Sequence, residues 1–309
     1  MKRKKGKNRT KISFVATILV LSVAAIIGYA FSFRVPSYSV PSNLPPYGGL
    51  IGRYAPADTL QVTFANYSAI RAVNASAVPD KQLVNLVKPA VTVHMNAVDA
   101  RVMVTILNLE EHINNTGTAA VMESGAYANL TGALDKATPV IKQVGGSSWA
   151  LYNVNDSSNG RTKAEWMAPV PGASSVVFAE GTADAQAIVL KMLSVWQGSS
   201  PSILSVMNVT RMLYPVSGTG HLAFSIQNFT GEVLTSNAGI VAVDYSGSQV
   251  QLTHVVHFAS AGYASSQVSE VQGVYKFATD FSTWEENVKA VQNYAQTNLE
   301  EAVALAGGS

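Results

Sequence analysis

The stretch ISFVATILVLSVAAIIGYAFSF, residues 12–33, decides the architecture of this chain. Its 22 residues include no charged side chain and are rich in aliphatic residues. At 1.5 Å per residue, a helix of this length reaches about 33 Å, which is enough to cross a hydrocarbon core of about 30 Å. Because an unpaired backbone group costs several kcal/mol in lipid, the sequence predicts a single transmembrane helix over residues 12–33.

The charges around this segment predict its orientation. Residues 1–11 carry seven basic side chains and no acidic one, so we expect a cytoplasmic tail here and an extracytoplasmic location for everything after the helix. The other 298 residues carry 14 basic and 19 acidic groups, a net charge of −5, so the +2 of the whole chain comes from the tail. Next to a membrane helix, topology explains this basic cluster better than nucleic-acid binding does.

Three other interpretations use residues of this segment or of the basic tail before it. Gly28-Tyr29-Ala30 resembles a small-x-small cleavage site, which would make the segment a signal peptide cut after Ala30; its apolar run, however, is longer than is typical. Lys5-Gly6 resembles the basic–glycine junction of pilin-type precursors, but further basic residues separate it from the apolar run. Ala24 and Gly28 form a small-xxx-small pair through which two anchors could pack as a homodimer.

Residues 34–58, which follow the helix, predict an extended stalk. Proline has no backbone N–H to donate and glycine weakens helices, and this short stretch is rich in both. The residues concerned are Pro36, Pro41, Pro45, Pro46 and Pro56, with Gly48, Gly49 and Gly52. Such a stalk would hold a folded body away from the membrane surface.

The composition excludes several classes of protein. Apolar residues make up 48% of the chain and charged residues only 13%, against a usual share of about 25%, which excludes a disordered acidic chain. The 309 residues contain no cysteine, so the chain has no disulfide framework, no thiolate nucleophile and no cysteine-ligated metal. The apolar content is sufficient for a sizeable core.

The body is predicted to be an α+β ectodomain of two similar lobes, each an α/β sandwich that runs strand, helix, helix, three strands, helix. The first lobe covers residues 59–145, a bridging segment covers 146–173, and the second lobe covers 174–281. Alternating or apolar runs predict strands at 59–66, 91–96, 101–108, 118–124, 148–153, 174–180, 220–228, 239–245 and 249–259. Helices are predicted at 67–74, 80–88, 125–138, 183–196, 202–213 and 263–277.

Residues 282–309 are predicted to form a C-terminal amphipathic helix. Ser282 and Glu285 have the spacing of a capping box, and Gly307-Gly308 would end the helix. One apolar stripe follows steps of three and four residues: Trp284, Val288, Val291, Ala295, Leu299 and Val303. The adjacent acidic pairs Glu285/Glu286 and Glu300/Glu301 would then be surface charges.

Seven N-x-S/T acceptors follow the membrane segment and predict a glycosylated outer face. They are Asn66, Asn74, Asn114, Asn129, Asn155, Asn208 and Asn228. Together with the absence of cysteine, they favour an archaeal-like cell envelope over a eukaryotic secretory pathway.

The search for chemistry finds no catalytic residue, no cofactor site and no metal site that the sequence supports. His254 and His257 would point to opposite faces of a strand. Glu110-Glu111-His112, with Asp99 nearby, indicates a solvated turn rather than a calcium site, because the D-x-D-x-D spacing is missing. Neither a G-x-S-x-G elbow nor a P-loop occurs. A sugar-stacking face is a weaker interpretation than core packing for three tryptophans: Trp149, Trp166 and Trp196.

These observations predict a membrane-anchored, extracytoplasmic and non-catalytic protein: a structural, binding or accessory subunit with the bilayer and an envelope protein as partners. Two alternatives stay open. One is an anchored hydrolase whose site assembles from distant residues such as His112 and His221. The other is a solute-binding pair of lobes for a transport system, with a cleft between the two halves.

Overall fold

The computed structural model of the chain describes residues 39–78, 82–88, 91–108, 115–154, 164–181, 185–227 and 238–306. Apart from Ser39, these residues belong to the unit Val40–Ser309. The predicted tail, transmembrane helix and first part of the stalk lie outside the described residues. Among the helices inside them, none is both long and apolar enough to cross a bilayer.

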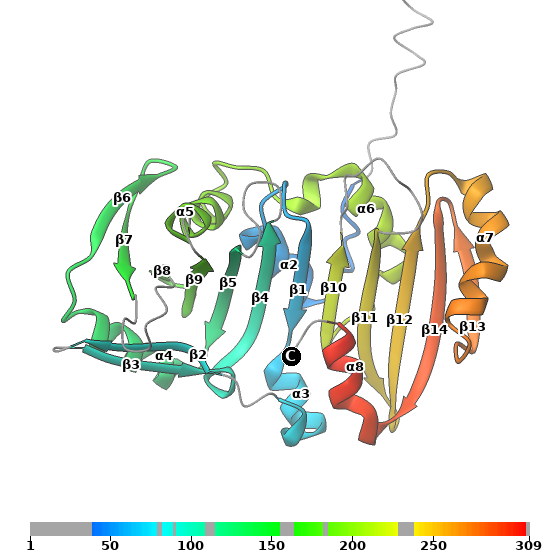
Figure 1. Ribbon diagram of the computed structural model, residues 1–309, viewed down its shortest axis with the longest axis horizontal. Coiled ribbons are helices and arrows are strands. Elements are labelled where there is room, and N and C mark those ends of the chain that lie inside the picture. Colours follow the sequence, from blue (N-terminus) through cyan, green and yellow to red (C-terminus); the bar gives the residue numbers. More distant parts are fainter. Residues whose placement is uncertain are drawn as a thin grey trace, which may run out of the picture. The chain divides into compact units, whose positions relative to one another are not determined.

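A twelve-stranded antiparallel sheet organises this unit, which is a mixed α/β structure (Figure 1). From one edge to the other, the strand order is β13-β14-β12-β11-β10-β1-β4-β5-β9-β8-β7-β6. In chain order the strands are β1 (Gln61–Ala65), β4 (Ala100–Asn108), β5 (Asn115–Met122), β6 (Val140–Val144), β7 (Ser147–Asn153), β8 (Ala164–Val170), β9 (Ser175–Gly181), β10 (Ala223–Gln227), β11 (Gly239–Ser246), β12 (Gln249–His257), β13 (Asp280–Trp284) and β14 (Asn287–Ala295).

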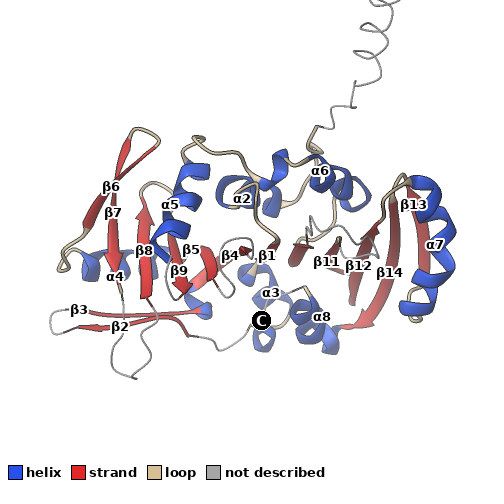
Figure 2. Ribbon diagram, turned by 45° about the horizontal axis from the view of Figure 1, so that its top comes forward, coloured by secondary structure: helices blue, strands red, loops and turns tan. Residues whose placement is uncertain are grey.

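Helices cover both faces of the sheet, so the unit has three layers (Figure 2). One face packs against α2 (Pro46–Tyr54), α5 (Ala185–Trp196) and α6 (Met207–Leu213). The other packs against α3 (Tyr67–Val73) and α8 (Leu299–Leu305), with α4 (Ser124–Leu134) towards one end. Helix α7 (Ala261–Val274) lies against β13 and β14. Short 3-10 turns lie at Ala75–Ala77, Ala97–Asp99, Ile203–Ser205, Tyr214–Val216 and Gln296–Asn298.

Alternation along each strand divides the core between the two faces. Phe64 and Phe224 are directly opposite each other on β1 and β10, and both point to the side of α2. Their neighbours Ala65 and Ala223 point to the side of α8. Because successive side chains of a strand point to opposite faces, a sheet buried on both faces carries apolar residues at consecutive positions.

The sheet is continuous across the predicted lobes. The central pair β1 and β10 joins a strand of the first predicted lobe to one of the second. The boundary predicted at residue 174 comes directly before β9, which pairs with β5 on one side and β8 on the other. Strands β7 and β8 of the predicted bridge are members of the same sheet. Strands from both predicted lobes and from the bridge are therefore members of one sheet, to which the separate hairpin of residues 82–96 does not belong.

Most of the predicted strands and helices are confirmed, with one exception inside the first lobe. The helix predicted at 80–88 is wrong, because β2 (Gln82–Lys88) forms a separate hairpin there with β3 (Val91–Asn96). The order of apolar and polar residues in this stretch is compatible with a strand as well as with a short helix. Pairing with β3 stabilises the strand.

The extended stalk is also wrong for the part that the structure describes. Pro46 starts helix α2, where its missing N–H is not needed and its restricted φ suits the first turn. Tyr47, Ile51 and Tyr54 of this helix are at most 1% exposed. Tyr47 stacks on Phe224, with ring centroids 3.9 Å apart. The segment is therefore part of the core rather than a spacer.

The C-terminal amphipathic helix over 282–309 is the third correction. Residues 280–295 form the hairpin β13–β14, a 3-10 turn follows at Gln296–Asn298, and the α-helix α8 covers Leu299–Leu305. Of the proposed capping residues, Ser282 lies within β13, paired with Lys289, and Glu285 lies at the hairpin turn with a φ of +47°. The first six residues of β14, 287–292, are buried or half-buried on both faces of the strand, which removes the alternation that identifies a half-buried strand.

Candidate functional site

A groove lies between helix α7 and the end of β12. It opens to solvent, and the space between its walls, including the solvent at its mouth, is about 520 Å³. We call it the α7 groove; it is lined by Val256, Phe258, Tyr263, Gln267, Glu270, Val271, Val274 and Tyr275.

Helix α7 presents two stripes to its surroundings. Ser260 caps its first turn by accepting a hydrogen bond from the N–H of Tyr263 at 3.2 Å. Ala264 and Val271 are its two buried residues, and they pack with Val256 and Phe258 in a small apolar cluster separate from the main core. The second stripe faces the groove with helical spacing of four, three and four: Tyr263, Gln267, Glu270 and Val274.

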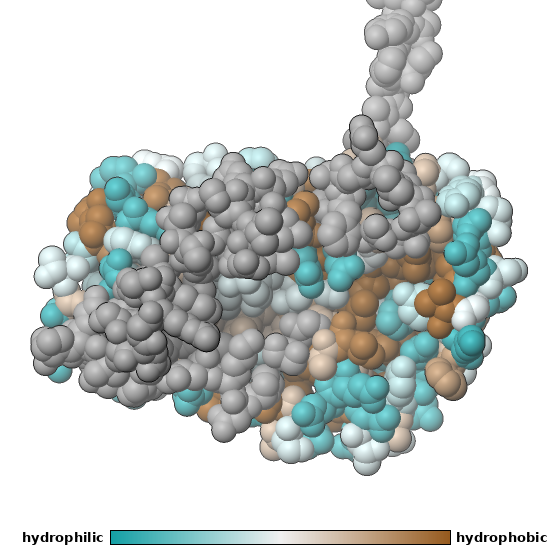
Figure 3. All heavy atoms as spheres, viewed as in Figure 1, coloured by the Kyte–Doolittle hydropathy of each residue, from teal (hydrophilic) through white to brown (hydrophobic). Residues whose placement is uncertain are grey.

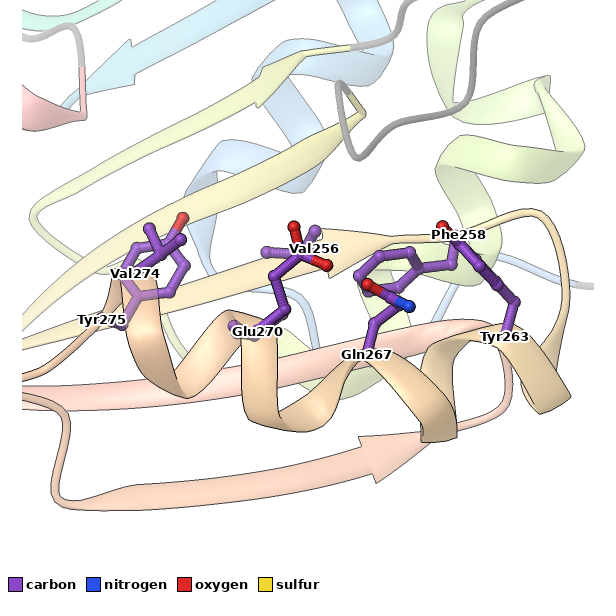
Figure 4. Close-up of a pocket in the computed structure, with 8 residues that line it drawn as sticks. Val256, Phe258, Tyr263, Gln267, Glu270, Val274 and Tyr275 are labelled. Carbon is purple, nitrogen blue, oxygen red and sulfur yellow. The ribbon is translucent and has the colours of Figure 1, made fainter.

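The groove has an apolar floor and a mixed rim. Val256, Phe258 and Val271 are each less than 10% exposed, whereas Tyr263 is 42% and Val274 70% exposed. Phe258 and Tyr263 meet edge to face at one end, with ring centroids 5.8 Å apart. Glu270 lies along the helix between this pair and Tyr275, and its side chain points towards Val256 (Figure 4).

Tyr275 connects the groove to the sheet. Its ring lies against the ring of His254 on β12, with centroids 4.4 Å apart. Burial raises the pKa of Tyr275 above its ordinary value. Burial also lowers the pKa of His254 from 6.5 to about 4, so this imidazole is neutral at physiological pH.

A second hollow, of about 380 Å³, adjoins the first and shares Val256 and Tyr275 with it. Its other lining residues come from β10, β11 and β12, and include Ser225, Gln227 and Val241. Figure 3 shows apolar surface over β11 and β12, between α7 and α8, in the same region. The apolar surface at this end of the sheet therefore extends from α7 towards β10.

Glu270 is the one charged residue that lines the α7 groove. In the part of the chain that the structure describes, no basic side chain lies within ion-pair distance of its carboxylate. The negative charge of a carboxylate attracts a cation, and the negative faces of nearby aromatic rings attract it as well.

The opposite face of β12 carries a polar cluster that serves the fold. His257 is 7% exposed, and its Nδ1 lies 3.1 Å from Oδ1 of the buried Asn287. Glu286 accepts a hydrogen bond from Nη1 of Arg211 at 2.6 Å, which ties the β13–β14 turn to α6. The sequence prediction that His254 and His257 face opposite sides is confirmed, whereas Glu286 is wrong as a helix-surface charge.

A histidine–aspartate pair lies near the start of β10. Nδ1 of His221 donates to Oδ1 of Asp244 at 2.7 Å, and the His221 side chain is 58% exposed. The same carboxylate accepts the backbone N–H groups of Gly220 at 2.7 Å and His221 at 2.9 Å. Asp244 therefore holds the turn before β10, as well as orienting the imidazole.

Four of the seven predicted glycan acceptors lie in the described residues. Asn66 and Asn74 cap the turns that they precede by accepting backbone N–H groups of Ala69 at 3.0 Å and Ser76 at 3.1 Å. Asn129 on α4 and Asn208 on α6 are exposed. The other three lie outside the described residues: Asn114, Asn155 and Asn228.

The remaining predicted site residues do not come together. Asp99 accepts the N–H of Asn96 at 2.8 Å within a turn, and Glu110-Glu111-His112 lies outside the described residues. Three tryptophans pack in or against the core on the α5 side: Trp149, Trp166 and Trp196. Within the described ranges, no three His, Asp or Glu side chains gather closely enough to hold a metal ion.

The α7 groove was missed in the sequence, although a signal exists. Tyr263, Gln267, Glu270 and Val274 share one helical stripe that mixes aromatic, aliphatic and polar residues. A second stripe with Ala264, Val268 and Val271 already supplies the packing face. One stripe is enough to pack a surface helix against the body. A second stripe with aromatic and aliphatic residues therefore indicates a surface that can contact a ligand or partner.

No protein-family model matches this chain, and no curated protein matches it. Among solved structures, crystal form IV of TP0453 is similar at 8% identity with a TM-score of 0.45, covering 81% of this chain and 97% of that chain. Crystal form I of TP0453 gives 8% identity and a TM-score of 0.44, covering 87% and 99%. Neither likeness assigns a function to this chain.

Proposed function

We propose that this chain is a membrane-anchored, extracytoplasmic and non-catalytic binding or accessory protein of a cell-envelope assembly. The observation that carries the proposal is the charge-free run at 12–33 directly after seven basic residues. That pattern favours a single transmembrane helix with its N-terminus in the cytoplasm and residues 34–309 outside. The proposal includes pairing of two anchors through Ala24 and Gly28.

The α7 groove supports a binding role for the body. It combines an apolar floor with a few polar side chains, which is the usual composition of a small-molecule site. The exposed rim, including Tyr263 and Val274, leaves apolar side chains in contact with solvent when the groove is empty. Filling the groove would remove this surface from water, which is favourable at about 25 cal/mol per Å² of apolar area.

We further propose that the sheet contains two copies of one unit. These copies would correspond to the two similar lobes that the sequence predicts, joined in one sheet. The order strand, strand, helix, hairpin occurs as β4–β5–α4–β6–β7 and again as β11–β12–α7–β13–β14. The antiparallel pair β1 and β10 lies between the two copies. The two copies differ in their place in the sheet, because β14 pairs directly with β12 whereas β9 and β8 lie between β5 and β7.

The outward orientation also implies glycosylation, which we propose for the seven acceptors as a group. The exposed positions Asn129 and Asn208 would carry a glycan away from the sheet. Replacing either with Gln would lower the mass of the purified chain by one glycan, as measured by intact-protein mass spectrometry.

Cysteine labelling tests the topology directly, because the chain has no cysteine of its own. Ala128→Cys places a thiol on the exposed side of α4, and Asn8→Cys places one in the basic tail. On intact cells, a membrane-impermeant maleimide should label the Ala128→Cys variant and leave the Asn8→Cys variant unlabelled. After permeabilisation, both variants should react.

Labelling of the tail but not of α4 on intact cells would contradict the proposal. So would recovery of the full-length chain in the soluble fraction of lysed cells, with residue 8 and residue 128 equally reactive. A gentle solubilisation that recovers this chain with an envelope protein would support the accessory role, and recovery of the chain alone would oppose it.

A specific observation favours an anchored hydrolase as the second candidate. The pair of His221 and Asp244 gives an exposed imidazole whose orientation a carboxylate holds, as a general base requires. If this candidate were right, His221→Ala would abolish ester hydrolysis by the purified chain. The same rate for His221→Ala and for the unaltered chain would exclude His221 as the base.

A further inference from the structure

We infer that the α7 groove binds a small organic cation that carries an apolar chain, of the alkylammonium class. The inference rests on the proposed binding function and deepens it by naming the site and the chemical class of the ligand. Three observations carry it: the apolar floor, the aromatic rings at the two ends and the one carboxylate between them.

The floor of the groove accounts for the apolar part of the ligand. Val256, Phe258 and Val271 close the bottom, and they are already packed against one another in their own small cluster. A preformed apolar floor needs little rearrangement to take up a chain, so little of the hydrophobic gain is spent on reorganisation.

The aromatic rings account for the preference for a cation. The edge-to-face pair of Phe258 and Tyr263 lies at one end, and Tyr275 at the other, held by its contact with His254. A quaternary ammonium group is attracted to the face of an aromatic ring, so a ring at either end of the groove can take the ammonium head. The neutral state of His254 avoids placing a competing positive charge behind Tyr275.

Glu270 accounts for the sign of the charge. Its carboxylate lies between the aromatic ends, within the helical stripe that faces the groove (Figure 4). Because no basic side chain of the described residues pairs with it, its charge is left to attract a cation and to repel an anion. The net charge of −5 on residues 12–309 has the same sign and favours the approach of cations.

Calorimetric titration with three probes of equal chain length tests the inference. The full chain is placed in nanodiscs of zwitterionic lipid and titrated with hexyltrimethylammonium, hexanol and hexanoate, with empty nanodiscs as the blank. We expect hexyltrimethylammonium to bind about 10-fold more tightly than hexanol, which corresponds to the upper part of the cation–π range. We expect no binding of hexanoate above the blank.

Matched variants then locate the site. Glu270→Gln removes the charge and keeps the shape, so it should weaken hexyltrimethylammonium binding about 10-fold and leave hexanol binding unchanged. Glu300→Gln, on the exposed side of α8, is the control and should change neither. Tyr263→Leu should weaken binding of the cation about 3- to 30-fold, and Tyr263→Phe should restore it.

Equal affinity for the three probes, failure of all three to bind, or an unchanged affinity in Glu270→Gln would each overturn the inference. A circular dichroism spectrum and a melting temperature equal to those of the unaltered chain ensure that a weaker variant is still folded. The proposed function fails separately, on the cysteine labelling: a body that binds the cation but lies in the cytoplasm keeps the site and loses the envelope role.

Discussion

Among single residues, His254 should make the stability of the fold depend on pH. The folded state holds its imidazole against Tyr275, where burial lowers its pKa to about 4, whereas the unfolded chain has the ordinary value of about 6.5. Between these two values the unfolded state takes up a proton that the folded state does not. Stability should therefore fall as pH falls from 6.5 to 4, by about 3 kcal/mol in total, with no further loss from this group below pH 4.

Replacement of His254 by Phe isolates this effect. Phenylalanine keeps a ring against Tyr275 and cannot titrate, so the loss of stability between pH 7 and pH 4.5 should be about 2 kcal/mol smaller than in the unaltered chain. Urea unfolding at the two pH values measures it. An equal loss in His254→Phe and the unaltered chain would contradict the prediction.

Gly220 is a second residue whose replacement should change stability, because there is little space for a Cβ atom at this position. It has a φ of +86°, and a Cβ there would lie 3.0 Å from both Phe224 and Tyr47. Gly218 has a similar φ of +79° but its nearest neighbour is 4.0 Å away. Each change to Ala should cost about 1–2 kcal/mol for the left-handed backbone. Gly220→Ala should cost about 1–3 kcal/mol more, from overpacking. Urea unfolding measures both variants, and equal unfolding midpoints for Gly218→Ala and Gly220→Ala would contradict the prediction.

The position and role of a single residue can be predicted from the sequence when they depend on its neighbours in the chain. Alternation along a strand is local, and it placed His254 and His257 on opposite faces correctly. The partner of Glu286 is Arg211, 75 residues earlier in the chain, and no spacing rule relates the two. Glu270 was missed for the same reason: its role depends on Phe258 and Val256, which the fold brings to α7 from the end of β12.

At the scale of elements, α2 provides a direct test of its correction from stalk to core helix. Ile51 is fully buried, so Ile51→Ala should destabilise the chain by about 2–5 kcal/mol through loss of contacts and the cavity left behind. Gly49 is exposed in the same helix with no atom within 4 Å of an added Cβ, so Gly49→Ala should stabilise it by about 0.5–1 kcal/mol. Chemical denaturation measures both, and an extended stalk would respond to neither.

The errors at this scale share a physical cause, which is that tertiary packing can outweigh local preference. Gly48 and Gly52 weaken α2 intrinsically, yet an added Cβ would lie 2.7 Å from Leu44 and 3.0 Å from Leu204 respectively, so close packing uses their lack of a side chain. In β14, apolar residues on both faces imitate a helical stripe. By contrast, β11 and β12 are separated by Ser246-Gly247-Ser248, a local turn signal that predicted their hairpin correctly.

At the scale of the whole body, one sheet through both predicted halves implies one cooperative unit. Phe224 is fully buried on β10, opposite Phe64 of β1, and it stacks on Tyr47 of α2. It therefore contacts chain segments from both halves. Phe224→Ala should cost about 3–5 kcal/mol. Because the central pair of strands connects the halves, this loss should be shared by strands on both sides of it.

Hydrogen exchange in the native state measures whether the loss is shared. In Phe224→Ala, the protection of amides in β5 and in β12 should fall by the same free energy, since both open only in the global unfolding of the sheet. Val271→Ala, in the small cluster under α7, is the control: it should lower protection in α7 and leave β5 unchanged. If β12 alone lost protection in Phe224→Ala, the two halves would unfold independently despite their shared sheet. The hydrogen bonds between β1 and β10 would then join two domains rather than form the centre of one.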